Sequence, residues 1–209
     1  MNRTHLSSIA TRTLLLGLCL SMAACSTRVT RMAPEQAVDL SGRWNDVDSR
    51  LVAEALIRES FENAHGVNWA MQHARANAGE PPVVIVGTVR NRSMEHIPVN
   101  TFVRDLEQAY LRSGQVQVVS SGAERGEIRA EREDQQEHAA GPTRARMAME
   151  QGAHYMLHGE IQSIEDQERR RRVVYYQVDM TLTDRETNTR VWAGQHRVKK
   201  YIQRPRFRL

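Results

Sequence analysis

The stretch from Val174 to Thr183 alternates between apolar and polar side chains without a break, and it constrains the fold more than any other part of the sequence. Successive side chains of a β-strand point to opposite faces of a sheet, so this alternation predicts a strand with one buried face. The side chains expected on the buried face are Val174, Tyr176, Val178, Met180 and Leu182. A chain that contains such a strand must form a sheet and cover one side of it.

Turn and strand signals surround this alternating segment. Further strands are expected over residues 83–89, 116–120, 154–164 and 190–199. The turn Asp184–Asn188 would join the alternating strand to the last one, with Asn188 in the left-handed backbone conformation that such a turn requires. The run Val83–Val89 is apolar and β-branched throughout, which is typical of a fully buried strand.

Apolar side chains at helical spacing occur between the expected strands. Helices are expected over residues 51–63, 69–78, 101–113 and 144–151. Asp48 or Ser49 would cap the first of these helices, Asn100 or Thr101 would cap the third, and Gly114 would end it.

Residues 122–140 are dense in charge, and Ile128 is their only large aliphatic side chain. This composition predicts an exposed helix, with disorder as the alternative. Together, the expected elements predict an α+β fold, in which helices pack on a mostly antiparallel sheet of four to five strands within a single domain.

Residues 1–24 have the layout of a secretory signal, because two arginines and no acidic residue precede the apolar run Thr13–Ala24. That run is too short to span a bilayer. It ends in two alanines followed by Cys25, as in the lipobox of bacterial lipoproteins. We therefore expect cleavage before Cys25, which would carry N-palmitoyl and S-diacylglycerol groups, while Ser26 and Thr27 indicate sorting to the outer membrane. The alternative is an ordinary signal peptide with an incidental cysteine.

Loss of the signal would leave 27 basic against 25 acidic side chains, so the charge gives no support to nucleic-acid binding. Cys19 would leave with the signal and Cys25 would be consumed by lipid, so no thiol would remain for a disulfide, a metal or a nucleophile. The expected organisation is a signal peptide over residues 1–24, a short tether over 25–45, a globular domain over 46–200 and a basic tail over 201–209.

Four blocks of the sequence, read together, resemble the LpoB family of outer-membrane lipoproteins, which activate class A penicillin-binding proteins. These blocks are residues 86–97, 128–138, 152–161 and 173–192. The resemblance covers roughly residues 44–200, and it implies a fold similar to the amino-terminal domain of TolB. Family members often carry glycine where this chain has Asn188, which also tolerates the left-handed conformation.

The resemblance implies a non-enzymatic protein, without cofactor, that is lipid-anchored in the outer membrane with its domain in the periplasm. It would regulate peptidoglycan synthesis by docking on the regulatory domain of a class A penicillin-binding protein and shifting it towards an active conformation. The best-studied branch of the family has a long proline-rich tether, which is nearly absent here. The alternative is therefore a structural or assembly adaptor of the outer membrane, similar to TolB or to curli-secretion proteins, without synthase binding.

The candidate contact residues for a partner are Arg92, His96, Arg169, Arg170, Arg171 and Arg172. The four consecutive arginines fall between two expected strands. They could dock an acidic partner surface or anionic lipid head groups, because guanidinium groups pair with carboxylates and phosphates in a bidentate manner. The plainer interpretation is a solvated hairpin loop.

A metal-dependent hydrolase is disfavoured. His154 and His158 are four residues apart on an expected strand, with Glu160 beyond them. This spacing separates the two imidazoles by roughly 13 Å, too far for one metal ion. We expect no metal site and no catalytic residue.

Overall fold

The computed structural model of the 209-residue chain describes residues 29–34, 36–62, 68–138 and 150–204. Chain contacts separate residues 1–36 from residues 37–209, and every helix and strand discussed here belongs to the second of these units. The predicted signal peptide, Cys25, Ser26 and Thr27 lie outside the described residues.

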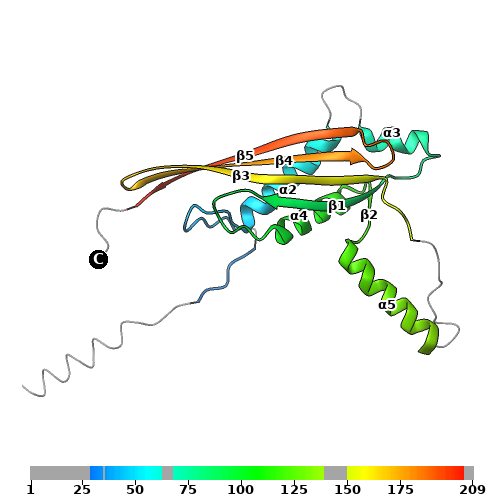
Figure 1. The fold of residues 1–209 in the computed structure, drawn as a ribbon. Helices are drawn as coiled ribbons and strands as arrows, with labels where there is room; N and C mark the ends of the chain where they lie inside the picture. Colours follow the sequence, from blue (N-terminus) through cyan, green and yellow to red (C-terminus); the bar gives the residue numbers. More distant parts are fainter. Residues whose placement is uncertain (1–28, 35, 63–67, 139–149, 205–209) are drawn as a thin grey trace, which may run out of the picture. The chain divides into compact units, whose positions relative to one another are not determined.

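A five-stranded sheet in the order β2-β1-β3-β4-β5 forms the centre of this unit (Figure 1). The strands are β1 (Val83–Asn91), β2 (Gln117–Val118), β3 (Tyr155–Glu168), β4 (Arg171–Asp184) and β5 (Arg190–Gln203). Strand β1 pairs in parallel with β2 and β3, whereas the long pairings of β3 with β4 and of β4 with β5 are antiparallel. The last strand runs three residues into the expected basic tail.

Helices cover one face of the sheet. They are α2 (Asp46–Phe61), α3 (Trp69–Ala76) and α4 (Val99–Ser113), and a fourth helix, α5, covers Gly122–His138. Helix α2 contacts β5 and α4 contacts β1, so the two lie side by side beneath the sheet (Figure 1). The main core lies between these helices and the sheet, and its fully buried side chains include Leu56, Phe102, Leu106, Leu157 and Tyr176.

The alternation in β4 is confirmed. Its even-numbered side chains from Val174 to Leu182 are buried in the core, while the odd-numbered ones are partly exposed on the opposite face. The predicted α+β fold with a single sheet is also confirmed. Among the described residues, no helix has both the length and the apolarity needed to cross a membrane.

The helix ends test the predicted caps. Helix α2 begins one turn earlier than expected, because Asn45 is its N-cap: the Asn45 side chain accepts a bond from the Asp48 amide, and the Asp48 carboxylate accepts one from the Asn45 amide. The predicted caps Asp48 and Ser49 are therefore wrong. Helix α4 follows Pro98 without any side-chain cap, but it ends as predicted at Gly114, whose φ of 65° is left-handed.

The charged segment forms helix α5, as predicted, and none of its side chains is buried. Arg104 of α4 forms an ion pair with Glu124, which lies near the start of α5. Most of the helix expected over residues 144–151 lies outside the described residues.

Candidate functional site

Residues 91–97, which comprise the last residue of β1 and the loop after it, are held in one conformation by their own side chains and by β3; we call this segment the β1 loop. The Asn91 side-chain oxygen accepts bonds from the Ser93 amide and hydroxyl at 2.9 and 2.6 Å, and its amide donates to the Glu95 carbonyl at 2.8 Å. The amide of Asn91 thus shapes a turn, as side chains of this type commonly do.

Two further bonds fasten the β1 loop to the neighbouring strand. The Arg92 amide donates to the Ile161 carbonyl at 2.8 Å, and the Met94 amide donates to the Ser163 hydroxyl at 3.0 Å. At the end of the loop, Ile97 is buried in the core. The loop is therefore an ordered extension of the sheet edge, although it has no regular secondary structure.

The β1 loop presents an apolar side chain between basic ones. Met94 is 82% exposed. Arg92 pairs with Glu160 at 3.2 Å but keeps 61% of its side chain exposed, and His96 is exposed as well. Arg92 and His96 are among the predicted contact residues, whereas Met94 is not; its signal in the sequence is a large apolar residue with polar neighbours on both sides.

Arg172 is placed differently from the other arginines of its run. Its side chain is 15% exposed and forms ion pairs with Glu95 at 3.2 Å and Glu165 at 2.6 Å. Burial opposes a charged guanidinium, but these two carboxylates raise the pKa of Arg172 above its ordinary value. The other oxygen of Glu95 accepts the Trp44 amide at 3.2 Å. Arg172 therefore ties the β1 loop to the hairpin of β3 and β4.

The remaining three arginines are at the tip of this hairpin. Arg169 and Arg170 form a two-residue turn, and Arg171 begins β4. All three are exposed, and within the described chain none of them takes part in an ion pair. Arg169 has a φ of 52°, which is left-handed and costly for a residue with a side chain. The sequence correctly predicted a hairpin here but could not separate Arg172 from its neighbours.

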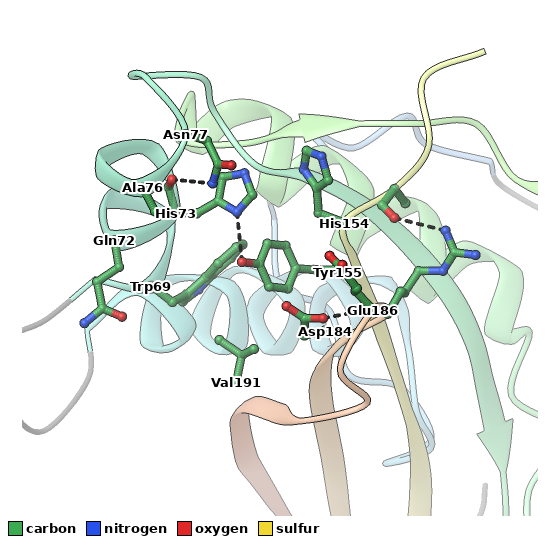
Figure 2. A pocket seen from close by; sticks show the side chains of 12 residues that line it. Trp69, Gln72, His73, Ala76, Asn77, His154, Tyr155, Asp184, Glu186 and Val191 are labelled. Atoms are coloured by element: carbon green, nitrogen blue, oxygen red, sulfur yellow. Dashed lines mark hydrogen bonds between the residues drawn. The ribbon is translucent and has the colours of Figure 1, made fainter. Parts of the chain in front are cut away.

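A cavity of about 770 Å³ lies between α3, the start of β3 and the turn after β4 (Figure 2). Nδ1 of His73 is 2.9 Å from the hydroxyl of Tyr155, and the rings of His73 and His154 are 4.7 Å apart. Nδ1 of His154 accepts the Val83 amide at 3.1 Å. His73 and Tyr155 are 82 residues apart, so no pattern of spacing in the sequence indicates this cluster.

The electrostatics of this cavity favour the neutral forms of His73 and Tyr155, whereas the bond from the Thr187 amide lowers the pKa of Asp184 and favours its charged form. Burial and the nearby His154 lower the pKa of His73, against the opposing charges of Asp184 and Glu80. Burial and Asp184 raise the pKa of Tyr155. No serine, threonine, cysteine or lysine is among the lining residues. The arrangement offers hydrogen-bonding groups but no activated hydroxyl, thiol or amine.

The two histidines weighed as metal ligands line different hollows. His154 lines the cavity beside α3, whereas His158 lines a hollow of about 610 Å³ on the other face of the sheet. Across the described ranges, no group of three or more histidine, cysteine or acidic side chains is placed to hold a metal ion.

Residues 48–198 match a protein family described as peptidoglycan-synthase activator LpoB. Among solved structures, the chain is similar to the LpoB C-terminal domain from Escherichia coli, with 15% identity and a TM-score of 0.43 over 73% of this chain and 99% of that one. The corresponding domain from Salmonella enterica gives 17% identity and a TM-score of 0.41 over the same shares.

A third similar structure is lipoprotein GNA1162 from Neisseria meningitidis, with 14% identity and a TM-score of 0.36 over 58% of this chain and 84% of that one. A search of curated proteins gives no match.

Proposed function

Because the chain belongs to the LpoB family of peptidoglycan-synthase activators, we propose that it is an outer-membrane lipoprotein that activates peptidoglycan synthesis by binding a class A penicillin-binding protein. The family match over residues 48–198 is the observation that carries this proposal. Lipid on Cys25 would hold the chain at the membrane, and the domain would act in the periplasm. Activation would be limited to the difference in affinity between the active and inactive conformations of the synthase.

The β1 loop is the surface we propose for docking the synthase. Its hydrogen bonds fix the backbone before binding, which reduces the entropy lost on association. Met94 offers an exposed, adaptable apolar contact, and Arg92 and His96 flank it with basic groups. An apolar contact surrounded by polar groups is the usual arrangement at the centre of a protein interface.

The reach of the tether limits where this docking occurs. Asp39 forms an ion pair with Lys200 at 2.7 Å, so the chain already contacts the domain at that residue. The segment from Cys25 to Asp39 is about 14 residues long, which spans roughly 40 Å when extended at about 3.1 Å per residue. The synthase domain would therefore have to approach the outer membrane to meet the β1 loop.

The first experiment is capture from envelope extracts with the full chain as bait, followed by the glycan polymerisation rate of the purified synthase with and without the chain. We expect recovery of a class A synthase and a faster rate. Recovery of an outer-membrane complex without any synthase would refute the proposal and indicate the adaptor function instead.

The docking surface is tested by the double variant Arg92→Ser/Met94→Ser. Helix α3 offers a matched control in Met71→Ser/Arg75→Ser, because it also removes one exposed methionine and one exposed arginine. We expect only the β1 loop variant to lose synthase binding, with both variants unfolding at nearly the wild-type temperature. Equal binding by the two variants would contradict the assignment of the β1 loop.

A further inference from the structure

Five exposed arginines gather where the chain joins the domain and where β5 ends; we call them the arginine end. They are Arg43, Arg169, Arg170, Arg171 and Arg204. The Arg204 amide donates to the Arg170 carbonyl at 3.0 Å, which fixes the end of β5 beside the hairpin turn. The Lys200 ammonium donates to the Arg43 carbonyl at 3.0 Å, which fixes the incoming chain against β5. The hairpin extends beyond α2 and α4 (Figure 1).

The charge of the arginine end is not neutralised within the described residues. None of its five guanidinium groups is part of an ion pair there. The neighbouring carboxylates of Glu95 and Glu165 are engaged by Arg172, and those of Asp39 and Asp48 by Lys200.

Two exposed carboxylates on β3, Asp166 and Glu168, offset part of the positive charge of the five arginines. The arginine end therefore keeps an excess of positive charge.

A cavity of about 850 Å³ opens at the arginine end and combines charged with apolar lining. Its lining includes Leu40, Arg43, Arg172, Ile202 and Arg204. Leu40 is 94% exposed, although it is a large apolar side chain. Gly42 shapes this wall: its φ of 70° is left-handed, and a β-carbon there would collide with the side chain of Ile202.

The opposite face of the sheet also carries an apolar side chain near the arginine end. Tyr201 of β5 pairs with Val173 of β4 and is 60% exposed, although it belongs to a strand. Aliphatic and tyrosine side chains next to arginines form the composition that suits the interface between lipid head groups and acyl chains. Both faces of the arginine end therefore offer apolar groups beside the cationic ones.

We propose that the arginine end binds the phosphate groups of anionic phospholipids in the leaflet that carries the lipid anchor. This inference rests on the proposed anchor at Cys25. Asp39 and Arg43 contact Lys200, so the chain that comes from Cys25 joins the domain at the arginine end, and this end needs the least of the tether's length to reach the leaflet. Guanidinium groups pair with phosphate oxygens in a bidentate manner, and Leu40 would enter the interfacial region.

The β1 loop and the arginine end adjoin, because Glu95 of the loop pairs with Arg172 at 3.2 Å and accepts the Trp44 amide at 3.2 Å. They are nevertheless formed by different exposed side chains. The synthase proposal rests on Arg92 and Met94, whereas the membrane proposal rests on the arginines of the arginine end. The two proposals can therefore fail separately.

The test uses the full lipid-bearing chain, reconstituted into vesicles of phosphatidylcholine alone or with phosphatidylglycerol. The intact mass first reports whether Cys25 carries lipid, so a failure of the anchor is seen before the vesicle measurement. Hydrogen exchange of residues 40–43, 168–172 and 202–204 is then compared. We expect slower exchange only in the anionic vesicles, and a return towards the neutral-vesicle rate at high salt, which screens exposed charges.

The charge dependence is tested with Arg43→Ser/Arg204→Ser. Each basic side chain near an anionic surface strengthens binding about fivefold. The slowing of exchange caused by anionic lipid should therefore be roughly 25-fold smaller in the double variant than in the wild type. The control Arg75→Ser/Arg190→Ser removes two exposed arginines elsewhere and should retain it.

The proposal would be overturned if the wild-type chain exchanged at the same rate in neutral and anionic vesicles. It would also be overturned if the two double variants lost the same amount of lipid-dependent protection. It would also be overturned if protection appeared in neutral vesicles only after a synthase domain was added, because the arginine end would then bind protein.

Discussion

Replacing Arg172 by methionine should destabilise the domain and release the β1 loop. The guanidinium joins Glu95 of the loop to Glu165 of the hairpin, at 3.2 and 2.6 Å. Methionine keeps the length and most of the apolar contact of the arginine stem but removes its charge. The change therefore isolates the ion pair from the packing around it.

The size of the effect follows from what Glu95 would lose. Its side chain is 9% exposed, and without Arg172 its carboxylate keeps only neutral neighbours among the described residues, the Trp44 amide at 3.2 Å and the Tyr176 hydroxyl. Removing one partner of a buried ion pair costs about 3 to 5 kcal/mol. Glu165 is 31% exposed and can be rehydrated, so we expect a loss near the lower limit, about 3 kcal/mol. For a domain of this size, that loss lowers the melting temperature by roughly 9 °C.

Urea unfolding of four chains measures this effect: wild type, Arg172→Met, Glu95→Gln and the double variant. The two single changes should couple by about 2 kcal/mol, because the double variant no longer buries an unpaired charge. Arg171→Met is the matched control, since Arg171 is exposed, and its free energy of unfolding should stay within about 0.5 kcal/mol of wild type. A loss below about 1 kcal/mol for Arg172→Met, as for a surface pair, would refute the reasoning.

Four further changes test local features. Gly159→Ala should lower the free energy of unfolding in urea by about 1 to 3 kcal/mol, because the new carbon would meet the Asp179 carbonyl; wild-type stability would contradict this. Arg169→Gly should raise the melting temperature by relieving about 1 kcal/mol at its left-handed φ of 52°. Asn45→Ala should cost about 1 kcal/mol by removing the cap of α2, measured by thermal unfolding, and no loss would mean that the cap is dispensable. Burial and the adjacent imidazole lower the pKa of His73 below its ordinary 6.5, so on acidification the unfolded chain binds this proton before the folded chain does. The melting temperature should therefore decrease as the pH is lowered from about 6.5, and His73→Gln should weaken this pH dependence.

Short-range patterns in the sequence were sufficient for several elements. The alternation along β4 depends only on the period of a strand, and its buried residues are the ones predicted. Gly114 and Asn188 adopt the left-handed conformations expected of them, with φ values of 65° and 58°. These features depend on local sterics, which neighbouring residues determine.

The predicted N-cap of α2 was wrong because neighbouring residues offer equally good local signals for a helix start. Asp48 is a good N-cap residue, but Asn45 takes that position and Asp48 serves as the third residue of α2. The early start lets the helix add Val47 and Ser49 to its buried side chains. The start at Asn45 is thus supported both by its capping box with Asp48 and by the burial of Val47 and Ser49, and the burial is the part that the cap residues alone do not indicate.

The arginine run shows most clearly what required the tertiary structure. By sequence alone, Arg172 is the last of four equivalent charges, yet it pairs with Glu95, 77 residues away in the chain. The cavity beside α3 likewise joins His73 to Tyr155 across 82 residues. The strand periods, the turns and the family could be read from the sequence alone, because they depend on neighbouring residues or on ordered blocks of residues. Only the folded chain decided which charges are buried and paired, because that depends on the side chains that a distant segment brings within hydrogen-bonding distance.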